Sequence, residues 1–202
     1  AFPCWDEPEY KAVFSITIVA DKQLLRVSNE KVLKEKEVED NKVETTFVDS
    51  MKMSTYLVAF VVGELEATKI GSASSTEVRI VHRPGFSHQT SYAGNAGIKL
   101  LDFFEDYYKI PYPGSKLDLI AIPDFAMGAM ENVGAVTFRE NLLLIDEEKA
   151  TRDELDRSVS VIAHELAHMW FGDLVTMKWW DGIWLNEAFA SLMEVIASFK
   201  TY

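Results

Sequence analysis

The residues best suited to chemistry form the motif His164-Glu165-Leu166-Ala167-His168. On an α-helix, residues four positions apart point about 40° apart, because each residue turns the helix by about 100°. Two imidazoles at this spacing can therefore reach one metal ion from the same side of the helix. The intervening Glu165 can reach a water on that ion without being a ligand. The motif predicts a metal centre with His164 and His168 as ligands and Glu165 as general base.

A catalytic zinc ion needs a third protein ligand and an open position. Glu187 follows His168 by 19 residues, and Gly172 and Gly182 between them allow the chain to turn back. We expect Glu187, at the start of a further helix, to be the third ligand. Glu194 shares a helix face with Glu187. It is either a side chain that orients a ligand or a surface glutamate in an exposed helix pair.

The predicted chemistry follows from this ligand set, with one Zn²⁺ per chain. A bound Zn²⁺ lowers the pKa of water toward about 7 and polarises a carbonyl group. Glu165 would act as general base on the zinc-bound water and later pass the proton to the leaving amine. The sequence thus predicts metal-assisted hydrolysis, with an amide as the expected substrate bond.

Two helices must position these residues. Thr151 and Glu154 form a capping-box pattern, and the helix that they open is expected to run to about Phe171, where Gly172 ends it. The next helix is expected to begin near Asn186. The first helix carries apolar residues that would bury its other faces: Val159, Ile162, Ala163 and Leu166.

The whole chain predicts an α+β fold that changes character near residue 84. Residues 13–19 alternate like a half-buried strand, and the apolar run 56–62 is typical of a strand buried on both faces. After the change, we expect a helix over 91–108, strands over 117–122 and 135–145, and a loop over 124–134. Three tryptophans are expected in the core, and two histidines outside the motif in loops or on the surface: Trp179, Trp180, Trp184, His82 and His88.

Composition excludes some partners. The chain has 20 Lys plus Arg and 32 Asp plus Glu, and a net charge of −12 argues against a nucleic-acid partner. No stretch of 18 apolar residues lacks charge, so no membrane segment is expected. Cys4 is the single cysteine, which excludes an internal disulfide, and we expect it to be buried. The chain begins at Ala1 without a methionine, and we expect it to be part of a longer protein.

Further motifs flank the metal motif in a fixed order. Gly128-Ala-Met-Glu-Asn132 precedes it, and Glu187 lies in Trp184-Leu-Asn-Glu-Ala-Phe-Ala190. Together with residues 1–8, 53–63 and 171–180, this combination resembles the zinc aminopeptidases of the alanyl/puromycin-sensitive type, which are gluzincins. The resemblance covers nearly the whole chain. Residues 1–8 and 53–63 are most similar to the puromycin-sensitive branch, which implies a cytoplasmic location.

The resemblance implies a fold and a substrate. Residues 1–83 would be the C-terminal part of a saddle-shaped β domain, and residues 84–202 the N-terminal half of a thermolysin-like zinc peptidase domain. The substrates would be peptides with a free N-terminus. Glu131 would bind the free α-amino group of the peptide. The neighbours of Glu131 would contact the rest of the peptide: Gly128, Ala129, Met130 and Asn132.

Two positions depart from the family pattern. Val133 stands where a tryptophan is usual, and Ala188 stands where glycine commonly follows the third ligand. The family's transition-state tyrosine is expected beyond residue 202, because Tyr202 lies only 15 residues after Glu187. Two alternatives stay open at this point: an epoxide hydrolase of the leukotriene-processing type, and a zinc-binding fragment that is catalytically incomplete.

Overall fold

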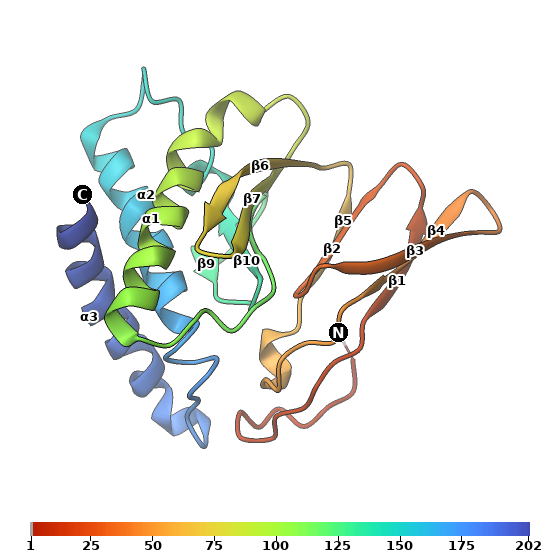
Figure 1. The fold of residues 1–202 in the computed structure, drawn as a ribbon, viewed down its shortest axis with the longest axis horizontal. Coiled ribbons are helices and arrows are strands. Elements are labelled where there is room, and N and C mark those ends of the chain that lie inside the picture. Colours follow the sequence, from red (N-terminus) through yellow and green to blue (C-terminus); the bar gives the residue numbers. More distant parts are fainter. Residues whose placement is uncertain (1) are drawn as a thin grey trace.

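The computed structural model describes residues 2–202 and has an α+β fold (Figure 1). A helical part and a β-rich part lie side by side, and the polypeptide passes from the second to the first along the sequence. The helices are α1 (Ser91–Tyr108), α2 (Arg152–His168) and α3 (Ile183–Thr201). The strands are β1 (Thr17–Asp21), β2 (Leu25–Ser28), β3 (Val32–Val38), β4 (Lys42–Phe47), β5 (Phe60–Gly63), β6 (Glu66–Ala73), β7 (Thr76–His82), β8 (Leu117–Ile122), β9 (Ala129–Met130) and β10 (Ala135–Arg139).

Three sheets organise these strands. β1, β4 and β3 form an antiparallel sheet, and β2 pairs with β5 in a two-stranded sheet. The third sheet has the order β6-β7-β8-β10-β9, in which β7, β8 and β10 are parallel and β9 is an antiparallel edge strand. This sheet contains strands from both sides of residue 84. A domain boundary between residues 83 and 84 would therefore separate strands that hydrogen-bond to one another.

The five-stranded sheet is covered on both faces. Leu119 of β8 packs in the cluster that includes α1, α2 and α3, whereas the adjacent Ile120 packs with Val27 and Ala59 from the β-rich part. Neighbouring residues of a strand point to opposite faces, so the helices lie on one face and the β2–β5 sheet on the other. α1 approaches β6 so closely that a Cβ atom on Gly94 would lie 2.4 Å from Ile70.

Several predicted elements are confirmed. The helix over 91–108 and the strand over 117–122 are present with these bounds. α2 begins with the predicted capping box: the Thr151 hydroxyl accepts from the Glu154 backbone N–H, and the Glu154 carboxylate accepts from the Thr151 N–H. α3 begins at Ile183, three residues before the expected Asn186. The described helices include none with the length and hydropathy needed to cross a membrane.

Other predictions are wrong. The run 56–62 is not a strand buried on both faces: a 3₁₀ turn occupies Thr55–Leu57, and Phe60 and Val62 of β5 are exposed. Among the described strands β5 pairs with β2, and its Phe60 and Val62 side chains are 51% and 42% exposed. The strand expected over 135–145 ends at Arg139. The structure also reverses two burial assignments, because Cys4 is exposed and His82 is buried against Thr68.

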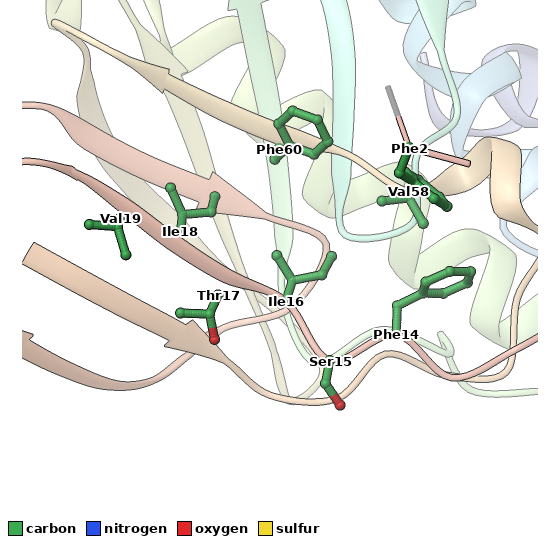
Figure 2. Close-up of a pocket in the computed structure, with 9 residues that line it drawn as sticks. All are labelled: Phe2, Phe14, Ser15, Ile16, Thr17, Ile18, Val19, Val58 and Phe60. Atoms are coloured by element: carbon green, nitrogen blue, oxygen red, sulfur yellow. The ribbon is translucent and has the colours of Figure 1, made fainter. Parts of the chain in front are cut away.

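An apolar groove of about 510 Å³ lies on the β-rich part, away from the helices (Figure 2). Ile16 and Ile18 point to the side of Phe60 in this groove, and Phe14 points to the side of Phe2 and Val58, whereas Ser15 and Thr17 point the opposite way. The period-two pattern predicted for residues 13–19 is therefore confirmed, although β1 itself begins at Thr17. The groove residues drawn in Figure 2 carry neither carboxylates nor imidazoles, so they do not supply metal ligands.

Candidate metal centre

The last turns of α2 carry both imidazoles of the sequence motif. Ile162 and Leu166 are fully buried in the helical core, and this packing turns the opposite face of α2 toward the first turns of α3. His168 is buried and His164 is partly buried on that face. Glu187 reaches them from α3 with its carboxylate about half exposed. The packing of two consecutive helices thus brings the three predicted ligand side chains together.

The distances between the three donor atoms fit a zinc ion. His164 Nε2 lies 3.1 Å from His168 Nε2 and 3.2 Å from Glu187 Oε2, and His168 Nε2 lies 3.7 Å from the same oxygen. A tetrahedral Zn²⁺ with bonds of about 2.0–2.1 Å holds its ligand atoms about 3.3–3.4 Å apart. The three observed separations scatter around this value, so the atoms form a triangle of the size that one zinc ion requires.

The outer nitrogen of each imidazole also has a partner. His168 Nδ1 lies 2.9 Å from the Phe171 carbonyl oxygen, and His164 Nδ1 lies 3.2 Å from Glu194 Oε2. Both partners are acceptors, so each Nδ1 carries a proton and donates it. Each Nε2 faces Glu187 and could bind a metal ion that displaces its proton. The structure places Glu194 against His164, as one of its two sequence interpretations requires.

The electrostatics of this cluster favour a positive charge. Burial opposes a charge on His164, but Glu187 and Glu194 raise its pKa to about 10. Conversely, hydrogen bonds from His164 and His168 hold the pKa of Glu187 far below its usual range. Two imidazoles facing one carboxylate therefore attract either protons or a metal cation, and the donor set of two nitrogens and one oxygen suits Zn²⁺.

Glu165 lies in the same cleft and is not one of the three converging side chains. Its side chain is buried, and this burial, followed by the negative charge of Glu131, raises its pKa to about 7. A carboxylate with such a pKa can accept and return a proton near neutral pH. The cleft has a volume of about 400 Å³, and both Glu165 and Glu131 line it beside the imidazoles.

Hydrogen bonds to neighbouring segments fix the loop that carries Glu131. Glu131 follows the edge strand β9 and is largely buried, and Ala129 and Met130 also line the cleft. Asn132 does not line it: its amide donates to the Leu57 carbonyl oxygen inside the protein, at 3.3 Å. Gly128 also lies outside the lining, and its carbonyl oxygen accepts from the Arg139 N–H.

Two supports of this loop were missed in the sequence. The buried Asn29 amide donates to the carbonyl oxygens of Leu57 and Val133. Gly134 has a φ of +70°, and a Cβ atom there would lie 1.9 Å from the Asn29 carbonyl oxygen, so only glycine fits. In the sequence, the glycine that follows Val133 is the one indication that the backbone makes a tight approach at this point. Val133, where the family usually has tryptophan, is fully buried beside Leu57.

The tryptophans do not form the core that the sequence predicted. Trp179 and Trp184 are 48% and 61% exposed, and Trp180 lines the cleft with its ring 5.4 Å from that of Tyr56. They lie in the connection before α3 and in its first turn, outside the packed face of that helix. Tyr56 is a cleft residue from the β-rich part that the sequence did not reveal.

A helix with two imidazoles around a glutamate, and a carboxylate from the following helix, define a candidate metallohydrolase centre. The chain belongs to peptidase family M1. The Peptidase family M1 domain matches residues 92–202, and the Peptidase M1 N-terminal domain matches residues 1–57. The first match covers more than half of the chain and includes all three converging side chains.

Related proteins agree with this assignment. The chain is 49% identical to the puromycin-sensitive aminopeptidase of Caenorhabditis elegans, over 96% of the chain and 21% of the relative. It is 50% identical to the endoplasmic reticulum aminopeptidase 2 of Homo sapiens, over the whole chain and 21% of the relative. Aminopeptidase M1 of Arabidopsis thaliana is 46% identical over 98% of the chain and 22% of the relative. The chain thus spans about a fifth of the length of these relatives.

Proposed function

We propose that this chain carries the zinc site and the N-terminus-binding site of an aminopeptidase that hydrolyses the first peptide bond of peptides. The observation that carries the proposal is the triangle formed by His164 Nε2, His168 Nε2 and Glu187 Oε2, with separations of 3.1–3.7 Å. Two further carboxylates lie in the same cleft, and each has a separate task in this reaction.

His164, His168 and Glu187 would hold the Zn²⁺. When bound, this ion supplies Lewis acidity toward a carbonyl group and lowers the pKa of water. Glu165 removes a proton from the attacking water, and its raised pKa lets it hold that proton. The same carboxyl group then gives the proton to the amine that leaves. Burial of Glu165 keeps this exchange away from bulk solvent.

Glu131 would select substrates by their free α-amino group. A carboxylate that is largely buried has a strong preference for a cationic partner, and an N-terminal ammonium group supplies one. Attachment of the ammonium group at Glu131 fixes the distance to the first peptide bond. Ala129 and Met130 form the free edge of the five-stranded sheet, where an extended peptide can hydrogen-bond to the backbone.

The three named relatives are all aminopeptidases, which supports peptide hydrolysis rather than epoxide hydrolysis. The proposal concerns the complete protein, because the chain spans only about a fifth of these relatives. The test combines metal analysis with turnover. We expect the complete wild-type protein to bind one Zn²⁺ per chain and to cleave an aminoacyl amide with a free amine. Glu187→Ala should release the zinc; full zinc occupancy in that variant would place the third ligand elsewhere.

A further inference from the structure

The connection between α2 and α3 determines how two metal-facing side chains meet. It runs over residues 169–182, directly after His168, and leads into the first turns of α3, which carry Glu187. Its first eleven residues, 169–179, form neither helix nor strand, and a 3₁₀ turn occupies Trp180–Gly182. Such a segment is flexible unless other parts of the molecule hold it. The separation of 3.7 Å between His168 Nε2 and Glu187 Oε2 therefore depends on how this connection is fixed, as well as on the packing of α2 against α3.

The first part of the connection folds back onto the end of α2. The backbone N–H groups of Asp173, Leu174 and Val175 donate to the carbonyl oxygens of residues 168–170, at 3.0–3.2 Å. These bonds satisfy the carbonyl groups at the end of the helix. They use the N–H groups of Asp173 and Leu174. The Asp173 carbonyl oxygen accepts a long hydrogen bond of 3.3 Å from the Thr176 hydroxyl, and the carbonyl oxygens of both residues can accept from further donors.

Lys11 supplies those donors from the opposite end of the sequence. Its ammonium group donates to the carbonyl oxygen of Asp173 at 2.8 Å and to that of Leu174 at 3.1 Å. Lys11 is partly buried, and its neighbour Ala12 is fixed by two backbone hydrogen bonds to Met53, each of 3.0 Å. The Lys11 ammonium group thus extends from a hydrogen-bonded backbone segment and lies just beyond the C-terminal end of α2, where a positive charge is favourable.

The same N-terminal segment also holds the far end of the connection. Trp180 Nε1 donates to the Asp6 carbonyl oxygen at 2.9 Å, and the Trp180 ring packs edge-on against Tyr56. In Figure 1 the red N-terminal segment and the blue connection approach each other at the bottom of the view. Residues 6–11 therefore contact both ends of the connection that separates two predicted ligands.

We propose that Lys11 is a positioning residue for the metal centre: by binding the carbonyl oxygens of Asp173 and Leu174, it fixes the connection that keeps Glu187 next to His168. The inference rests on the proposed zinc site. By this inference Lys11, which belongs to the β-rich part and precedes His168 by more than 150 residues, contributes to the metal affinity of the site. Free of this contact, the connection gains conformations in which the three donor atoms lie too far apart for one ion.

The test compares zinc affinities in the complete protein. Lys11→Met removes the ammonium group and keeps an unbranched side chain. Metal-free protein is titrated with Zn²⁺ in competition with a chelator of known affinity, at a temperature where circular dichroism shows that each metal-free variant is folded. We expect Lys11→Met to weaken zinc binding about tenfold, as loss of a group that orients a ligand does. Lys11→Arg, which keeps a cation with several N–H donors, should recover most of the affinity.

A matched control is Lys22→Met, because Lys22 belongs to the β-rich part and its ammonium group forms an exposed ion pair with Glu37. Its zinc affinity should equal that of the wild type. Should Lys11→Met fail to fold, Trp180→Phe removes the second donor and keeps an aromatic ring; we expect a loss of about threefold. Wild-type affinity in Lys11→Met, an equal loss in Lys22→Met, or no recovery in Lys11→Arg would overturn the inference about Lys11. Failure of the wild type to bind zinc would instead overturn the proposed metal site.

Discussion

Glu194 lies against the outer edge of an imidazole whose inner edge faces the other predicted ligands. Its Oε2 atom is 3.2 Å from Nδ1 of His164. The two residues belong to different helices and are 30 positions apart, so the contact exists only because α2 packs against α3. The carboxylate keeps a proton on Nδ1, so Nε2 is the nitrogen that faces Glu187 and that a metal ion would bind.

Removal of this carboxylate should weaken the metal site. We expect Glu194→Ala to lower zinc affinity about 10–100-fold, because His164 loses the partner that fixes its orientation and its proton. The measurement is a competition titration with a zinc chelator. Glu148→Ala, at an exposed position before α2, is the control and should leave the affinity unchanged. Equal affinities in both variants would make Glu194 a surface glutamate after all.

Glu165 should be needed for turnover and dispensable for metal binding. Glu165→Gln keeps the size of the side chain and removes its ability to accept a proton. We expect bound zinc to remain and kcat to fall about 10²–10⁴-fold. Elemental analysis and steady-state kinetics on the same preparation measure the two effects. Turnover close to that of the wild type would remove Glu165 as the general base.

Glu131 should discriminate between free and blocked amines. Glu131→Ala removes a largely buried negative charge from the cleft. We expect kcat/KM for a substrate with a free α-amino group to fall on the order of 10²-fold, because a buried charge pair is lost. The weak hydrolysis of the N-acetylated counterpart should change little. Equal losses for both substrates would show that Glu131 does not bind the amine.

A buried ion pair should make stability depend on pH. Burial alone would raise the pKa of Asp118. The cations of Lys116 and Arg79 lower it by a larger amount, so the pKa of Asp118 lies below its usual value. A carboxyl group with a lowered pKa stabilises the fold above its unfolded pKa of about 3.9, and this contribution is lost as pH falls through the folded pKa. We expect Asp118→Asn to lower the free energy of unfolding by about 3 kcal/mol at pH 7, and by less below about pH 4.

The control for that measurement is Asp106→Asn, which removes an exposed ion pair with Lys109. Such a pair contributes about 0–1 kcal/mol, so its loss should be small at every pH. Denaturant unfolding at pH 7, 5 and 3 gives both curves. A deficit for Asp118→Asn that stays constant down to pH 3 would contradict the assignment of a lowered pKa.

The sequence pattern is sufficient to predict an element when that element buries one of its faces and exposes the other. The capping box of α2, the helix Ser91–Tyr108 and the pairing of His164 with His168 on one helix face all follow from spacing along single helices. The approach of Glu187 from α3 also depends on the packing of α2 against α3. The sequence pattern is insufficient for the run 56–62, because burial of an apolar strand depends on which sheets cover it. In the described structure β5 has one neighbouring strand, β2, and the spacing of apolar residues within the run does not indicate how many neighbours a strand has.

Contacts between distant segments were also beyond the sequence. Lys11 and Asp173 are 162 positions apart, and neither residue type indicates the other. The tryptophans were misplaced for a related reason. Large aromatic side chains are usually buried, but those that line a cleft or the start of a helix remain exposed when function or further packing uses them. Trp180 shows this, since its ring forms part of the cleft wall.

The parallel pairing of β7 with β8 has a practical consequence for dissecting the molecule. Val78–Val81 hydrogen-bonds along Leu117–Ile120, and Ile80 is fully buried. A recombinant polypeptide that starts at residue 84 would leave β8 with a bare edge and invite aggregation. A polypeptide designed to carry the three helices should therefore start no later than residues 64–65, between β5 and β6, so that the hairpin of β6 and β7 stays paired with β8.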